Sequence, residues 1–400
     1  MSEQPEIDYE AFREEVRAFL AANLPDDIRE ATRLTASMFP HMPTAIAWQK
    51  ILHRQGWAAP HWPVEFGGPG WDLHQQMIFR EEQDLAGAPS TIMQGLFMCG
   101  PVLMGHGTKA QQDYYLPRLL SAEHIWCQGY SEPASGSDLA SLKMSAVPDG
   151  DDYILNGSKI WTSNAHEASH MFLLVRTSTE GRPQQGITFL LLEMDTPGIT
   201  VEPIINLNGV QEQNQVFFDD VRVPQANRVG AENDGWTVAK YLLEFERSMS
   251  YAAPLKKRLR QIRRSASEEV AADGTPLIDD RVFRRKLAEA EINARAFIAT
   301  EMRVNAETAA GRSPGPAASV LKIAGADARQ ALDKLWLQTV GLNGVPLQPE
   351  ALVPGNNVGS LVPDHALTAM ATWLDDRSTT IAGGSAEVQR SIVAKAVLGL

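Results

Sequence analysis

The hydrophobic period changes twice along this chain of 400 residues, and this change limits the possible folds more than any single motif does. Apolar residues recur at helical spacing from about Tyr9 to Ser121. From about Ile125 to Val229 the period becomes two, in short β-rich runs such as Met171-Phe-Leu-Leu-Val175 that are separated by Asp-Gly, Glu-Gly and Pro-Gly turn signals. Helical spacing returns beyond Asn233. The sequence therefore predicts an α+β protein in which a β-domain separates two helical regions.

Three domains are expected from this pattern. They are an all-helical N-terminal domain over residues 1–124, a central antiparallel β-barrel or sandwich over 125–231, and a C-terminal four-helix bundle over 232–400. The bundle helices are expected at residues 235–271, 280–311, 317–340 and from 385 onward. Pro254 falls inside the first of them and cannot donate a hydrogen bond to Ser250, so we predict a kink there.

The acidic composition limits the possible partners and compartments. A net charge of −13 argues against nucleic-acid binding, which needs a basic face, and no apolar run approaches the ~20 residues of a membrane span. With no signal-peptide pattern and only two cysteines, Cys99 and Cys127, a cytoplasmic protein is expected. The run from Lys256 to Arg264 holds six basic residues in nine; it could bind coenzyme A phosphates or an acidic subunit, or form a solvated helix face.

One polar loop is a candidate ligand site. The stretch Gln128-Gly-Tyr-Ser-Glu-Pro-Ala-Ser-Gly-Ser-Asp138 is too polar for a core and too rich in glycine for a helix. Its hydroxyl groups stand at Tyr130, Ser131, Ser135 and Ser137. The loop either presents N–H and O–H groups to a polar ligand or is an ordinary turn before a strand.

A second stretch favours the ligand. In Asn156-Gly-Ser-Lys-Ile-Trp-Thr-Ser-Asn164, the Asn-Gly pair and the alternating pattern predict a strand that carries Trp161 and Ser163. A large flat ring beside small hydroxyl groups suits a flat heteroaromatic cofactor such as a flavin better than a phosphate or a metal.

A rival chemistry is suggested by His166-Glu-Ala-Ser-His170, which has the His-Glu-x-x-His spacing of zinc hydrolases. That site needs a helix several turns long, so that both imidazoles lie on one face. A β-rich run follows His170 directly, so we expect a loop or a single helical turn, and a zinc hydrolase is only a remote alternative.

Together these motifs resemble those of the flavin-dependent acyl-CoA dehydrogenase family. The family pattern Ser-Glu-Pro-x-x-Gly-Ser-Asp followed by Trp-x-Ser-Asn is present, and the resemblance covers nearly the whole chain. Further matches are Phe218-Asp-Asp-Val-Arg-Val-Pro224, Gly235-Trp236, Gln338-x-x-Gly-x-x-Gly344 and Gly384-Ser-x-Glu-Val-Gln-Arg390. Several motifs in the right order are a specific signal, whereas one alone is weak.

The resemblance implies FAD as cofactor, an acyl-CoA substrate and electron-transfer flavoprotein as electron acceptor. The FAD-binding residues that it implies are Gln128, Tyr130, Ser131, Trp161, Ser163, Gln338, Gly341, Ser385 and Gln389. Ser137 and Arg247 are the implied contacts to the substrate. Family members often use an Arg-x-x-Phe-Gly motif and a later Gln to bind the FAD of the neighbouring subunit, but this chain has Ala272-Asp-Gly-Thr-Pro276 and Arg281 in that region. Such incomplete motifs resemble the large subunits of pimeloyl-CoA and steroid side-chain dehydrogenases, so a heterotetramer is expected beside the alternative of a homotetramer.

The catalytic carboxylate of most members is missing at its usual place. Gly383 stands where those members carry a glutamate, in Ala382-Gly-Gly-Ser385. Some members place the base on an earlier helix in a Glu-Arg pair, which Glu246-Arg247 matches. Glu246 also shares a helical stripe with Ala239 and Leu242, so we expect it to be the α-proton base. The alternative is a catalytically silent subunit that only binds FAD or coenzyme A.

The segment from Val345 to Asp375 is longer than we expect for the family. It either reshapes the acyl pocket or forms a solvated loop.

Overall fold

The computed structural model describes residues 7–247, 250–309 and 314–400. The chain divides into two compact units, each built from three segments. The first contains residues 1–91, 250–313 and 328–373, and the second contains residues 92–249, 314–327 and 374–400.

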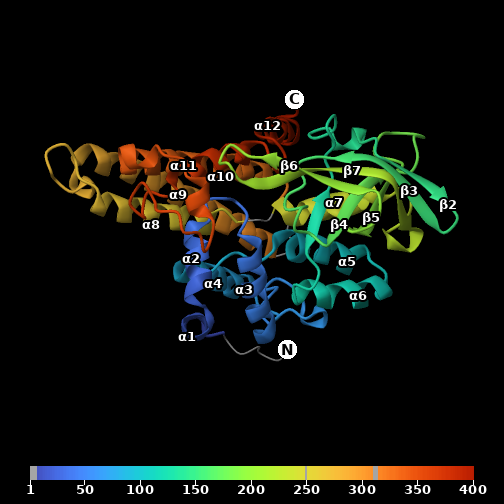
Figure 1. Cartoon of the computed structure of the whole chain (residues 1–400), viewed down its shortest axis with the longest axis horizontal. Coiled ribbons are helices and arrows are strands. Elements are labelled where there is room, and N and C mark those ends of the chain that lie inside the picture. Colours follow the sequence, from blue (N-terminus) through green and yellow to red (C-terminus); the bar gives the residue numbers. More distant parts are fainter. Residues whose placement is uncertain (1–6, 248–249, 310–313) are drawn as a thin grey trace. The chain divides into compact units, whose positions relative to one another are not determined.

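The first unit is helical. Its complete helices are α1 (Tyr9–Asn23), α2 (Asp26–Leu34), α3 (Met42–Gln55), α4 (Leu73–Ala86), α8 (Ala252–Glu268) and α9 (Arg281–Ala309). Helices α10 (Pro316–Val340) and α11 (Ala369–Asp375), both labelled in Figure 1, have residues in each unit. Helix α4 begins with a capping box, in which Asp72 accepts a hydrogen bond from the backbone of Gln75 and the Gln75 side chain accepts one in return.

The basic run on α8 has acidic partners within this unit. Lys256 pairs with Glu81 at 3.0 Å, and Arg258 pairs with the fully buried Asp333 at 2.7 Å. Arg263 and Arg264 pair with Glu291 and Glu268. The run is therefore largely a set of intrachain ion pairs, which agrees better with a helix face than with a site for phosphates.

The second unit is built around one sheet of eight strands. The strands are β1 (Trp126–Gly129), β2 (Ser145–Asp149), β3 (Asp152–Lys159), β4 (His170–Arg176), β5 (Ile187–Glu193), β6 (Ile199–Ile205), β7 (Gln211–Pro224) and β8 (Arg228–Val229). Their order is β6-β7-β3-β2-β4-β5-β8, and β1 pairs with β4. Strands β2 to β7 are labelled in Figure 1. The helices of this unit are α5 (Gly100–His106), α6 (Lys109–Leu120), α7 (Gly235–Arg247) and α12 (Ala386–Val393).

The alternation of side chains explains the core of the sheet. On β3, Tyr153 and Leu155 are fully buried and pack with Val221 and Val223 of β7, their neighbours in an antiparallel ladder. Strands β4 and β5 are apolar on both faces because they are covered on both, and nearly every residue of each is buried.

The expected fold class is confirmed: helices, a mainly antiparallel sheet, then helices. Strand β4 pairs in parallel with both β1 and β2, and the sequence pattern did not predict these parallel pairs. Among the described residues no helix is both long and apolar enough to cross a membrane.

The single long helix expected over residues 235–271 is wrong. Arg247 is the last described residue of α7, Ser250 and Tyr251 are not helical, and α8 begins at Ala252. Pro254 therefore lies in the first turn of a new helix and does not kink an old one. Proline is tolerated there because the first backbone N–H groups of a helix have no intrahelical partner.

Candidate functional site

The two stretches singled out in the sequence meet in the second unit. The backbone N–H of Ile160 donates to the carbonyl of Ser131 at 2.9 Å, which joins the end of β3 to the polar loop after β1. The Tyr130 ring is buried next to this junction and packs edge-on against Phe172 and Phe189. Because Gln128 and Gly129 belong to β1, the polar loop from here on means the segment from Tyr130 to Ser141.

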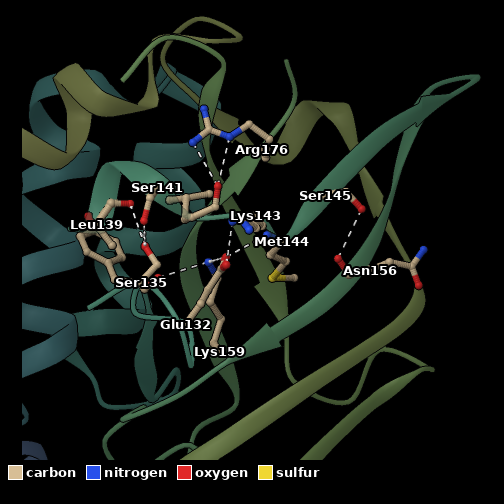
Figure 2. A network of polar contacts seen from close by, with 12 residues as sticks. Glu132, Ser135, Leu139, Ser141, Lys143, Met144, Ser145, Asn156, Lys159 and Arg176 are labelled. Atoms are coloured by element: carbon tan, nitrogen blue, oxygen red, sulfur yellow. Dashed lines mark hydrogen bonds and ion pairs between the residues drawn. The ribbon is translucent and has the colours of Figure 1, made fainter. Parts of the chain in front are cut away.

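The polar loop is held by its own hydrogen bonds. Glu132 and Ser135 exchange two backbone hydrogen bonds, at 3.0 and 2.9 Å. The Ser135 hydroxyl donates to the carbonyl of Asp138 at 2.8 Å. The Ser141 hydroxyl lies 3.1 Å from that of Ser135 (Figure 2). Serine side chains favour such local bonds to the backbone, so the loop has a defined shape although only its last three residues, Leu139–Ser141, form a short 3-10 helix.

A buried ion pair links the polar loop to β3. The Lys159 ammonium donates to Glu132 Oε1 at 2.8 Å (Figure 2). It also donates to the carbonyl of Tyr130 at 3.2 Å. Glu132 also accepts the backbone N–H groups of Lys143 and Met144, at 2.7 and 2.9 Å. Burial lowers the pKa of Lys159 to about 8, against the opposing effect of the Glu132 charge.

Trp161 does not lie on a strand, contrary to the sequence-based expectation. Strand β3 ends at Lys159, and Trp161 has a left-handed backbone with φ of 60°. Asn164 is left-handed too, so this short loop turns away from the sheet. The Trp161 side chain is 59% exposed, which leaves a large ring face available.

The loop that carries Trp161 is hydrogen-bonded to the start of β7. The backbone N–H of Thr162 donates to Asn214 at 3.0 Å, and that of Asn164 donates to Glu212 at 2.7 Å. The Ser163 hydroxyl lies 3.2 Å from the side chain of Gln213. These bonds position Ser163 and Trp161 relative to the sheet.

The C-terminal segment reaches the same strand. Asn208 donates to Asp375 at 3.2 Å, in the turn before β7. Burial and the nearby Asp375 carboxyl raise the pKa of Glu212 to about 9, so the Glu212–Asp375 pair retains a proton at neutral pH. The residues after Asp375 lead through Gly383 to α12, so Ser385 and Gln389 belong to the unit that carries Trp161.

Two side chains, the N-cap residue Ser385 and Gln389 within α12, show how this segment is ordered. The Ser385 hydroxyl accepts the backbone N–H of Val388 and caps the helix. Gln389 is 3% exposed, and its Oε1 has no hydrogen-bond partner among the described residues. A buried polar atom without a partner is costly, so Gln389 fits a polar ligand that supplies the missing donor.

Family models match the chain from end to end. The model described as acyl-CoA dehydrogenase, N-terminal domain, matches residues 6–123, the middle domain matches 127–221, and the C-terminal domain matches 233–398. The chain belongs to the acyl-CoA dehydrogenase family. Its class is therefore that of an acyl-CoA dehydrogenase, an oxidoreductase of a flavoprotein family.

Individual acyl-CoA dehydrogenases support this membership. Acyl-CoA dehydrogenase IpdE1 of Mycobacterium tuberculosis is 35% identical over 404 residues, 98% of each chain. The ChsE4-ChsE5 complex from Mycobacterium tuberculosis contains a chain that is 31% identical, with a TM-score of 0.83 and coverage of 100% of this chain and 99% of that one. The Tcur3481-Tcur3483 steroid ACAD has a TM-score of 0.84 at 27% identity and covers the same shares.

The other expected site residues of this acyl-CoA dehydrogenase are not gathered in one unit. Gln128 is half-buried on β1, and Ser137 is exposed in the polar loop. Gln338 and Gly341 belong to the first unit, where both are exposed. Glu246 and Arg247 lie on α7, but their side chains are outside the described part of the chain.

The two histidines of the zinc-like motif have separate surroundings. His166 Nδ1 lies 3.1 Å from Asn214, whereas His170 begins β4 and stacks on His124 with ring centroids 3.9 Å apart. Burial lowers the pKa of His170 to about 4. Among the described residues, no three His, Cys, Asp or Glu side chains are grouped to hold a metal, so the geometry gives the zinc alternative no support.

Sequence reasoning did not assign a role to Glu132, Lys159 or Glu212. One signal was available for Lys159, because the period of two places it on the same side of β3 as Tyr153 and Leu155. A lysine at an inward position of a strand predicts a buried acidic partner. Nothing in the sequence pattern indicated that Glu212 would approach Asp375, 163 residues later.

Proposed function

We propose that this acyl-CoA dehydrogenase is FAD-dependent and converts an acyl-CoA thioester to the trans-2-enoyl-CoA. The hydrogen bond between Ile160 and Ser131 carries the proposal, because it brings the polar loop and the exposed Trp161 into one site. FAD, when bound, supplies the acceptor for the hydride that leaves the β-carbon. The residues of the chain hold the cofactor and move the α-proton.

Several side chains of the second unit suit the flavin. Trp161 offers an exposed aromatic face for stacking, and Ser163 and Ser131 offer hydroxyl groups beside it. Gln389 has a buried oxygen that can accept a hydrogen bond. In this proposal Tyr130, Gln128 and Ser385 complete the site from the same unit.

The α-proton base in this proposal is Glu246. Gly383 has no side chain that could take a proton. On α7, Glu246 follows Ala239 and Leu242 at seven- and four-residue spacing, and those two residues are fully buried. A carboxylate on an apolar helix face is desolvated more easily when the substrate enters, which raises its pKa toward neutrality. Ser137 and Arg247 are the proposed donors to the thioester.

A second subunit is the proposed partner. Gln338 and Gly341 are exposed in their own unit, as residues that serve a neighbouring subunit's cofactor would be. Two similar solved structures are complexes of two different chains, ChsE4-ChsE5 and Tcur3481-Tcur3483. We therefore propose a heterotetramer in preference to a homotetramer, with electron-transfer flavoprotein as the acceptor.

Anaerobic bleaching of the flavin tests this function. Protein purified alone and with a co-expressed partner would be mixed, without oxygen, with a panel of straight-chain and steroid-derived acyl-CoA thioesters. The proposal predicts loss of the flavin absorbance with at least one thioester and formation of its 2-enoyl product. A flavin that no thioester reduces in either preparation would favour the silent subunit instead.

A further inference from the structure

The buried, charged side chain of Lys159 has no part in the proposed reaction. Its side chain is 0% exposed, and its partner Glu132 is 9% exposed. Removing an ammonium and a carboxylate from water is unfavourable for both groups, and a well-packed apolar pair of similar size is often as stable. A buried ion pair is thus weak evidence for stability, and its position in the fold becomes informative.

The pair stands where β3 gives way to the loop of Trp161. Lys159 is the last residue of β3, two positions before Trp161. Its ammonium binds the carbonyl of Tyr130 at 3.2 Å, next to Ser131, whose carbonyl accepts from Ile160 at 2.9 Å. One side chain therefore joins the backbones of both proposed flavin-binding stretches.

Glu132 extends this connection to the far end of the polar loop. Its two carboxylate oxygens accept the N–H groups of Lys143 and Met144, which precede β2 (Figure 2). Arg176 holds the same end of the loop through the carbonyls of Ala140 and Leu142, at 2.7 and 3.0 Å. Lys159 thus acts on a loop whose two ends are both anchored, so its loss would change the internal shape of the loop more than the anchoring.

We propose that Lys159 is a positioning residue for the cofactor: its ammonium fixes the Tyr130 carbonyl and the Glu132 carboxylate so that the polar loop has its FAD-binding shape before FAD arrives. This inference rests on the proposed function. A site that is already ordered loses less entropy when the cofactor binds, so the contacts of Lys159 should increase the affinity for FAD.

The test compares the affinity of apoprotein for FAD among four proteins. Flavin fluorescence would give the Kd, and thermal unfolding would give the stability, for wild type, Lys159→Met, the double variant Lys159→Met/Glu132→Gln and Arg222→Met. The double variant leaves no uncompensated buried charge and should regain part of the stability that Lys159→Met loses. Arg222 is the matched control, since it pairs with Asp149 and Asp152 at an exposed position of β7 in the same sheet.

If Lys159 positions the polar loop, the Kd for FAD should be at least about tenfold higher in both Lys159 variants, equivalent to about 1.4 kcal/mol, and unchanged in Arg222→Met. The affinity should stay low even where the double variant regains stability. If the double variant binds FAD within twofold of wild type, Lys159 has only a structural role and the inference is overturned. Wild-type protein that takes up no FAD would overturn the proposed function as well, so the two failures are distinguishable.

Discussion

At the scale of single residues, the environment of a side chain decides its role more than its type does. Trp161 and Trp126 are both tryptophans of the second unit, yet Trp126 is 1% exposed in the core and Trp161 is 59% exposed on a left-handed loop. The motif around Trp161 could be recognised from the sequence. Its exposed ring could not, because the alternating pattern indicated that the strand continues through it.

Replacing Trp161 by Ala should weaken FAD binding about fivefold, since stacking of an aromatic pair contributes about 1 kcal/mol beyond buried area. Equilibrium dialysis of apoprotein with FAD measures this change. Phe217→Ala removes an exposed aromatic ring from β7 and serves as the control. Equal losses of affinity in the two variants would contradict stacking on Trp161.

Glu212→Gln should alter how stability depends on pH. The ordinary carboxyl pKa near 4.5 is raised to about 9 in the folded protein, so the folded state binds more protons than the unfolded chain between these values. The free energy of unfolding therefore falls as pH rises through this window, by at most about 1.4 kcal/mol per pH unit.

Glutamine cannot ionise, so the variant should lose stability less steeply between pH 5 and 9, as urea unfolding at several pH values would show. Glu202→Gln, at an exposed position of β6, is the control. Parallel curves for Glu212→Gln and wild type would rule out a shifted carboxyl at Glu212.

At the scale of elements, the hydrophobic period predicted the strands well and their ends less well. The apolar runs of β3, β4, β5 and β7 could be located because alternation and Gly turn signals are local properties. The division into α7 and α8 was missed, since helical spacing continues across the break and Pro254 also suits a first turn. The boundaries of the three predicted domains remain a prediction.

The contribution of the N-cap of α12 to stability and to FAD affinity can be tested at the scale of one element. Ser385→Ala removes the hydroxyl that accepts from Val388, so the protein should lose about 1 kcal/mol of stability and bind FAD less tightly. Ser391→Ala on the same helix, where the hydroxyl bonds back to Glu387, is the control and should be nearly neutral. Calorimetry with and without FAD measures both effects, and an unchanged unfolding temperature in Ser385→Ala would contradict the capping role.

At the scale of the whole molecule, long-range contacts bring into one unit the motifs that lie far apart in the sequence. Residues near 130, 160, 212 and 385 fold into one unit, and the links between them, Lys159–Glu132 and Asn208–Asp375, join positions 27 and 167 residues apart. The resemblance to the family supplied this grouping in advance. Period and turn signals could not supply it, because they carry no information about partners so distant in sequence.

The central claim is that this acyl-CoA dehydrogenase removes the α-proton with Glu246. The most direct measurement is the rate of anaerobic flavin reduction by a substrate thioester in stopped flow, for wild type, Glu246→Gln and the control Glu244→Gln. The account predicts that Glu246→Gln keeps its FAD and its affinity for the thioester but reduces its flavin at least about 100-fold more slowly, the usual scale for loss of a general base, while Glu244→Gln matches wild type. Reduction of Glu246→Gln at the wild-type rate would show that another residue takes the proton.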